Sequence, residues 1–175
     1  SFSGSLIRNN INIAIDGENC EGHMNGIYLL NGKTHVDNNT AVDHKAPNSY
    51  SNELYKGILS GTSKGVFNGK IYVRPIAQKT NAFQSNNNVI LSEKATVHTK
   101  PQLEIWADDV KCSHGCTVGQ LDEEAIFYLQ SRGIAKDSAI SLMLNAFTQD
   151  TLNEIDEELV KNEIIDLIEE GLKNG

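Results

Sequence analysis

The chain has 175 residues, enough for one compact or elongated domain and too few for a multidomain enzyme. Its 23 acidic residues against 15 Lys and Arg give a net charge of -8, which disfavours binding to the phosphate backbone of a nucleic acid. No apolar run approaches the roughly 20 residues that span a bilayer, and three cysteines are too few for a disulfide framework. We therefore expect a cytoplasmic protein that binds neither nucleic acid nor membrane.

The composition changes after Leu121. Residues 1–121 hold all three Pro and 11 of the 14 Gly, with 10 acidic residues against 11 basic ones. Residues 122–175 hold 13 acidic residues against 4 basic ones and are rich in Leu and Ile. The change predicts a mainly β domain over 1–121 and a small α-helical segment over 122–175.

Short apolar bursts mark the predicted strands of the first part. Alternation of apolar and polar residues, as over 11–15, gives a strand one inward face. This pattern predicts that Ile13, Leu29, Ile71 and Ile105 lie inside. The bursts recur at intervals of about 15 residues, a spacing typical of a sandwich, a barrel or a solenoid. They lie at 11–15, 27–30, 41–42, 58–59, 71–73, 89–91 and 103–106.

Turn-forming residues are expected between these bursts. They include Asp16-Gly17, Asn31-Gly32, Asn68-Gly69 and the three asparagines at 86–88. Asn-Gly pairs also close two-residue hairpins, so the spacing alone leaves an antiparallel sandwich and a parallel β-helix both open. In the parallel arrangement, the Asn-rich corners would stack in ladders from coil to coil.

Three helices are predicted in residues 122–175. Asp122 can cap the first helix, and Arg132-Gly133 can end it. Asp137 is predicted to cap the second, and Asp150 or the next residue to start the third. The helices carry more apolar surface than they can bury among themselves, so we expect them to pack on the β domain or against a partner.

One compact cluster of metal-capable side chains is present, at Cys112, His114 and Cys116. On an extended strand all three would point to the same face, because side chains alternate with a period of two. A closed zinc site commonly needs a second pair of ligands far downstream, which the sequence lacks. Spacing alone therefore favours buried or hydrogen-bonded structural roles and leaves open a partial site completed by another chain.

Longer segments carry a resemblance to a known family. Residues 99–115, which include Trp106 and the Cys112-Ser113-His114-Gly115 motif, are followed by Thr117-Val118-Gly119 and by 127–134, and together they resemble the C-terminal region of the SufD family. Earlier segments at 35–40, 43–47, 55–59 and 65–70 resemble the same family.

Two differences separate this chain from the related SufB family. SufB-like chains carry a sulfur-accepting cysteine in the stretch that corresponds to 84–88, where this sequence has none. They also carry acidic residues on both sides of the histidine that matches His114, where this sequence has Ser113 and Gly115. Both differences indicate SufD.

The resemblance implies a right-handed parallel β-helix, the C-terminal coils of a longer solenoid, followed by helices. It also implies a non-catalytic scaffold subunit of the SufBCD iron–sulfur cluster assembly complex, with a SufB-like subunit and a SufC-like ATPase as partners. A role in cluster assembly at the SufB–SufD interface maps onto Cys112 and His114, and none maps onto Cys116. We expect no cofactor bound stably by this chain alone, and a transient iron or iron–sulfur cluster in the complex.

Two further surfaces are predicted to bind partners. The last strand, from Val110 to Val118, is expected to pair with a SufB-like subunit, or with a second copy of this chain as a homodimer when that subunit is absent. The helical region of the resembled family docks the SufC ATPase, and a few apolar side chains should dominate that contact. The predicted anchors are Leu144, Phe147, Leu152 and Ile155.

An alternative function is a metal-dependent enzyme built on a β-solenoid or a cupin-like barrel. Such an enzyme would place two histidines and a carboxylate on neighbouring strands. The remaining histidines, His23, His35, His44 and His98, show no convincing spacing of this kind.

Overall fold

Each turn of the chain contributes one strand to each of two facing parallel sheets. The computed structural model describes residue 1 and residues 4–173, and this part of the chain forms eight strands followed by three helices. The strands are β1 Leu6–Ile15, β2 Glu21–Leu30, β3 His35–His44, β4 Tyr50–Leu59, β5 Lys64–Val73, β6 Asn81–Ile90, β7 Thr96–Ile105 and β8 Lys111–Gly119. One sheet has the order β1-β3-β5-β7 and the other β2-β4-β6-β8, with all neighbours parallel.

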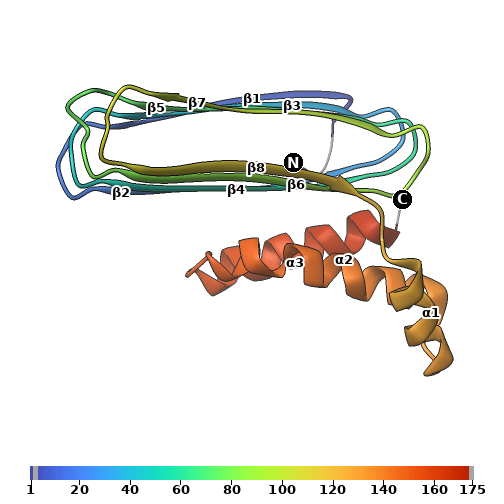
Figure 1. The fold of residues 1–175 in the computed structure, drawn as a ribbon. Coiled ribbons are helices and arrows are strands. Elements are labelled where there is room, and N and C mark those ends of the chain that lie inside the picture. The colour runs from blue at the N-terminus through green and yellow to red at the C-terminus, as the bar shows by residue number, and fades with distance from the viewer. Residues whose placement is uncertain (2–3, 174–175) are drawn as a thin grey trace.

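This arrangement is a parallel β-solenoid of about four turns, which confirms the predicted fold class (Figure 1). The corners between the sheets use backbone conformations that repeat from turn to turn. Gly32 and Gly61 have φ values of 55° and 66° at one corner, and Asn19 and Asn48 have 56° and 57° at the other. Glycine and asparagine tolerate this left-handed region best. Asn31-Gly32 therefore forms a corner between two sheets and not a hairpin.

Two of the predicted turns are wrong, because they lie inside strands. Asn68-Gly69 lies within β5, where the Asn68 amide donates to Asn39 Oδ1 of the preceding turn at 3.2 Å. Gly69 faces the interior, where a Cβ atom would collide with Gln84. The three asparagines at 86–88 lie within β6. Asparagine can therefore extend a solenoid strand when its amide pairs with the neighbouring turn.

The main apolar core lies between the two sheets. Ile71 is fully buried there, and Ile13 packs against the same cluster, as predicted. Leu29 is buried on the outer side of its sheet, in a second cluster with Ile58 and helix residues. Ile105 lies beside the interior residue Val73, but it is 38% exposed because β7 is the last strand of its sheet. The predicted interior position is therefore wrong for Leu29. For Ile105 the predicted side of the sheet is right, but the predicted burial is wrong.

Three helices follow the solenoid: α1 Glu123–Ser131, α2 Lys136–Asn153 and α3 Glu158–Lys173. Figure 1 shows α2 and α3 along the outer side of the sheet that contains β2 and β4, with α1 farther from the strands. Asp122 caps α1 by accepting hydrogen bonds from two backbone N–H groups, as predicted.

The predicted boundaries of the later helices need correction. Asp137 lies within the first turn of α2, and the capping position is occupied by Ala135. Asp150 does not start a third helix, because α2 continues to Asn153. None of the helices in the described ranges is both long and apolar enough to cross a membrane.

Candidate functional site

The last strand of the solenoid carries the predicted cluster-assembly residues. β8 pairs with β6 along one edge, and no strand pairs with its other edge among the described residues. Neighbouring residues of parallel strands point to the same side of a sheet. Four alternate residues of β8 therefore face the interior side at the end of the solenoid: Cys112 beside Ala82, His114 beside Gln84, Cys116 beside Asn86 and Val118 beside Asn88.

These four side chains differ in exposure. Their partners on β6 are buried by β8, but no further turn in the described residues covers β8 itself. His114, Cys116 and Val118 are consequently exposed, whereas Cys112 is half-buried against the interior core. Burial raises the pKa of the Cys112 thiol, and a backbone hydrogen bond with Ala82 partly offsets this shift. The thiol is thus mainly protonated at neutral pH until a metal or another positive charge approaches.

The three sulfur and nitrogen ligands form a row and not a cage. Alternate residues on a strand lie roughly 6.6–6.8 Å apart, so Cys112 and Cys116 are about twice that distance from each other. In the part of the chain that the structure describes, no three His, Cys, Asp or Glu side chains are grouped closely enough to hold a metal ion. This strand can therefore contribute ligands to a site that another chain completes. The ligand set required by the alternative enzyme is also not found among these residues.

A buried polar pair lies in register with His114. Gln84 is the β6 neighbour of His114, and Glu53 on β4 is the next residue in the same row. Both side chains are 1% exposed, and Gln84 Nε2 donates to Glu53 Oε2 at 2.6 Å. Burial raises the pKa of Glu53, and the adjacent Thr40 and Gln84 side chains partly offset this shift. The sequence analysis missed this pair, although polar residues at inward strand positions were a usable signal.

The two valines predicted to flank the edge strand occupy different surroundings. Val110 precedes β8, and its side chain packs against the interior core. Val118 is 50% exposed near the end of β8. Of these two valines, Val118 is therefore the one that presents an exposed apolar side chain beside the unpaired edge.

The four residues predicted to anchor a partner lie largely against the solenoid, three of them on α2 and Ile155 in the connection between α2 and α3. Leu144 is fully buried with Leu29 and Ile58, and Phe147 packs against the same cluster. Leu152 is also buried, and Ile155 is half-buried. In this conformation Leu144 and Leu152 are not accessible to another chain. Other apolar side chains of the helices are exposed, namely Phe127, Tyr128, Leu142, Leu159, Val160 and Leu167.

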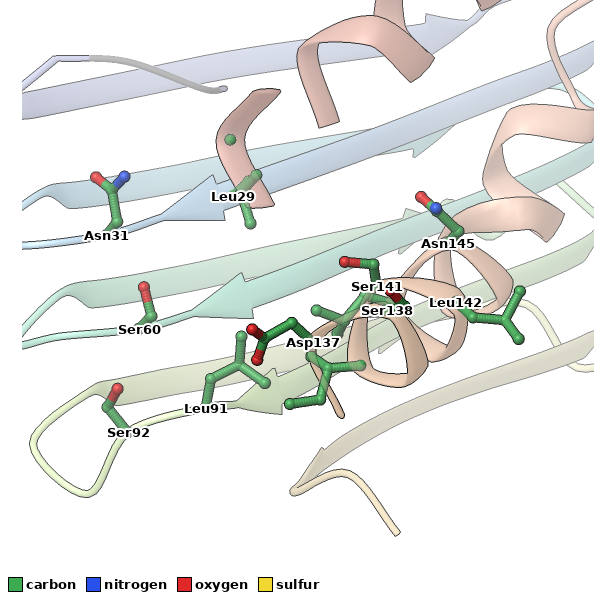
Figure 2. Close-up of a pocket in the computed structure, with 13 residues that line it drawn as sticks. Leu29, Asn31, Ser60, Leu91, Ser92, Asp137, Ser138, Ser141, Leu142 and Asn145 are labelled. Atoms are coloured by element: carbon green, nitrogen blue, oxygen red, sulfur yellow. The ribbon is translucent and has the colours of Figure 1, made fainter. Parts of the chain in front are cut away.

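A groove of about 890 Å³ lies between α2 and the neighbouring sheet. Figure 2 shows Asn31, Ser60 and Ser92 at the edge of this groove on the solenoid, and Asp137 and Ser141 on α2. The lining has a single carboxylate and contains no histidine or cysteine. Its chemistry therefore suits neither a metal site nor a nucleophile activated by a base.

A known protein family matches most of this chain. Residues 1–147 match the model described as "SUF system FeS cluster assembly, SufBD core domain". The chain belongs to the SufBD family. The match covers the whole solenoid, including β8, and extends into α2.

Several curated SufBD proteins are similar to this chain. The iron–sulfur cluster assembly protein SufD of Escherichia coli is 38% identical over 174 residues, which cover 99% of this chain and 41% of that protein. A SufBD family protein of Synechocystis is 37% identical over 155 residues, which cover 89% of this chain and 34% of that protein. The chloroplastic protein ABCI7 of Arabidopsis thaliana is 30% identical over 164 residues, which cover 93% of this chain and 34% of that protein. The chain spans less than half the length of these relatives.

Proposed function

We propose that this chain is a non-catalytic scaffold subunit for iron–sulfur cluster assembly, with Cys112 and His114 as its contribution to an intersubunit site. The observation that carries this proposal is the position of β8. This strand ends the solenoid, has an unpaired edge among the described residues, and places both side chains on one face. The SufBD family to which the chain belongs supports the same assignment.

The ligand chemistry fits a transient cargo. Iron–sulfur clusters are bound mainly by cysteine thiolates, with histidine as an occasional substitute. One Cys and one His are half of a four-ligand set, so the remaining ligands come from the partner. A shared and incomplete set also releases a finished cluster more easily than a closed cage of four protein ligands.

The unpaired edge of β8 is the surface through which this chain binds that partner. An exposed strand edge presents free N–H and C=O groups that pair readily with another chain. We assign this edge to a SufB-like subunit, and to a second copy of this chain when that subunit is absent. The exposed Val118 adds an apolar contact beside the edge.

Substitution of the three ligands tests the assignment. The complex of this chain with its SufB-like and SufC-like partners is purified, and iron and sulfide are measured per complex after reconstitution. Cys112→Ala and His114→Ala should each lower the cluster yield while leaving subunit assembly unchanged. Cys116→Ala is the matched control on the same strand and should retain the yield. Equal yields from all three variants would refute the proposed role of Cys112 and His114.

The helical segment is assigned to a SufC-like ATPase. Residues 122–175 carry 13 acidic residues against 4 basic ones, which favours a basic partner surface and predicts association that slows as salt increases. The exposed apolar residues of α1, Phe127 and Tyr128, are the accessible candidates for anchors. Leu144 and Leu152 would contact this partner only if α2 left the solenoid.

Point substitutions test this docking more cleanly than truncation. Removal of residues 137–175 would uncover Leu29, Ile58 and Val89 on the solenoid, so loss of binding after truncation would be ambiguous. We expect Phe127→Ala combined with Tyr128→Ala to weaken binding of the SufC-like ATPase at least tenfold, as for buried aromatic anchors. Pairing with the SufB-like subunit should be unchanged. Unaltered ATPase affinity in this double variant would exclude α1 as the docking element.

A further inference from the structure

The row of residues beneath His114 contains two buried polar side chains that no step above uses. His114, Gln84 and Glu53 lie on the neighbouring strands β8, β6 and β4, at positions that are directly in register. All three therefore face the same interior side of the sheet. The row runs from a fully buried carboxyl group to an exposed imidazole at the end of the solenoid.

Gln84 is held in place but keeps a free acceptor. Its amide nitrogen donates to Glu53 Oε2, whereas its carbonyl oxygen Oε1 is buried without a hydrogen-bond partner. Gly69 of the facing sheet lies against the same side chain, where a Cβ atom would collide with the Gln84 amide. Buried acceptors normally have a donor, so an orphan oxygen in the interior row requires an explanation.

His114 can supply the missing donor from the next strand. A neutral imidazole carries one N–H group, and its other nitrogen is free to bind a metal. A histidine that ligates a metal usually donates its second nitrogen to a carbonyl or a carboxylate, which fixes the tautomer and the ring orientation. Gln84 Oε1 is a carbonyl of this kind, and Glu53 secures the other end of the same amide.

We propose that Glu53 and Gln84 are positioning residues for His114. When a partner covers the end of the solenoid, one ring N–H group of His114 donates to Gln84 Oε1, and the Gln84 amide donates to Glu53. The opposite ring nitrogen is then directed at the intersubunit site. This inference rests on the proposed function, since it describes how His114 is prepared for iron or a cluster.

The interior row also predicts which substitutions matter. Gln84→Met keeps the length and approximate volume of the side chain but removes the acceptor, so it should lower the cluster yield of the assembled complex about tenfold, as losses of outer-shell partners do. Glu53→Gln should retain the yield, because its amide oxygen still accepts from Gln84. Glu53→Met should lower the yield, because Gln84 loses its anchor. Asn38→Leu is the control, because Asn38 is a buried amide of the solenoid on β3, in the opposite sheet.

The tautomer of His114 in the assembled complex tests the positioning role of Gln84 and Glu53 directly. Only this chain is labelled with ¹⁵N-histidine, and long-range ¹H–¹⁵N correlation spectra are compared for the assembled wild-type and variant proteins. The wild-type chain, Glu53→Gln and Asn38→Leu should show one fixed tautomer, whereas Gln84→Met and Glu53→Met should show a mixture. If Gln84→Met does not assemble, Glu53→Met carries the same comparison.

The possible failures can be told apart. If His114→Ala leaves the cluster yield unchanged, the proposed function of His114 fails. If His114→Ala lowers the yield but Gln84→Met and Glu53→Met leave both the yield and the tautomer unchanged, the positioning role is overturned and the proposed function stands. A loss of yield with an unchanged tautomer also overturns the positioning role, because a packing defect alone would produce it.

Discussion

The Tyr28 hydroxyl donates a hydrogen bond to Asn88 Oδ1 inside the solenoid, across 60 residues of sequence. The same hydroxyl accepts a hydrogen bond of 3.2 Å from Asn86 Nδ2. Asn88 Nδ2 in turn donates to the backbone carbonyl of Thr117 on β8, at 3.2 Å. A buried tyrosine on β2 is therefore linked through β6 to the terminal strand that carries Cys112 and His114.

Tyr28→Phe should destabilise the solenoid, because it leaves the buried Asn88 Oδ1 without the donor it has in the wild type and removes one acceptor of Asn86 Nδ2. Loss of one partner of a buried hydrogen bond costs about 1–3 kcal/mol, so the free energy of unfolding should fall by that amount. Urea unfolding followed by circular dichroism measures the change. Tyr128→Phe, at an exposed tyrosine of α1, is the control and should stay within about 0.5 kcal/mol of the wild-type value. Equal stability of the two variants would mean that the interior network contributes little.

Gly57→Ala should be more damaging than a typical glycine substitution in a strand. A Cβ atom at Gly57 would overlap both the Tyr28 ring and the Asn88 amide, so the interior network must move to admit it. Overpacking of this kind costs about 1–3 kcal/mol. Gly115→Ala, on β8, meets nothing within 4 Å and is the matched control. Thermal denaturation of the two variants should show a lower midpoint for Gly57→Ala alone.

Lys56 should hold α2 against the solenoid. Its side chain is 7% exposed, pairs with Asp150, and donates to the Phe147 carbonyl at 2.6 Å. Hydrogen bonds to charged groups contribute about 1.5–3 kcal/mol, so Lys56→Met should increase hydrogen exchange of α2 amides at least about tenfold. Lys64→Met, at an exposed lysine of β5, should leave this exchange unchanged. Protection of α2 that is equal in both variants would show that apolar contacts alone dock the helix.

Glu53 should make stability fall as the pH rises. Burial raises the pKa of Glu53 above its ordinary value of 4.5, so the folded state retains a proton that the unfolded state releases. The stabilising contribution of the protonated group is complete below pH 4.5 and is lost as the pH rises through the folded pKa. Relative to the wild type, Glu53→Gln should therefore gain up to about 1.4 kcal/mol per pH unit over that interval. Urea midpoints compared between about pH 5 and about pH 8 measure this difference, and parallel curves would contradict it.

Several local features could be predicted from the sequence because short-range chemistry controls them. The apolar bursts mark strands because alternation gives a pleated segment one buried face. Asp122 starts α1 because its carboxylate satisfies backbone N–H groups within the same turn. Asn68-Gly69 was misassigned because the same pair can close a hairpin or continue a strand. The contact of Asn68 with Asn39, 29 residues earlier, decides between the two.

The features of the candidate site likewise fall into two groups, those that local alternation predicts and those that contacts between distant residues decide. The placement of Cys112, His114 and Cys116 on one face of a strand follows from local alternation, since a period of two needs no tertiary information. The register of His114 with Gln84 and Glu53, and the packing of Leu29 against α2 and not in the interior, depend on the three-dimensional arrangement. The physical reason is that register between turns and the docking of helices depend on contacts between residues that are distant along the chain. Alternation within one strand carries no information about such contacts.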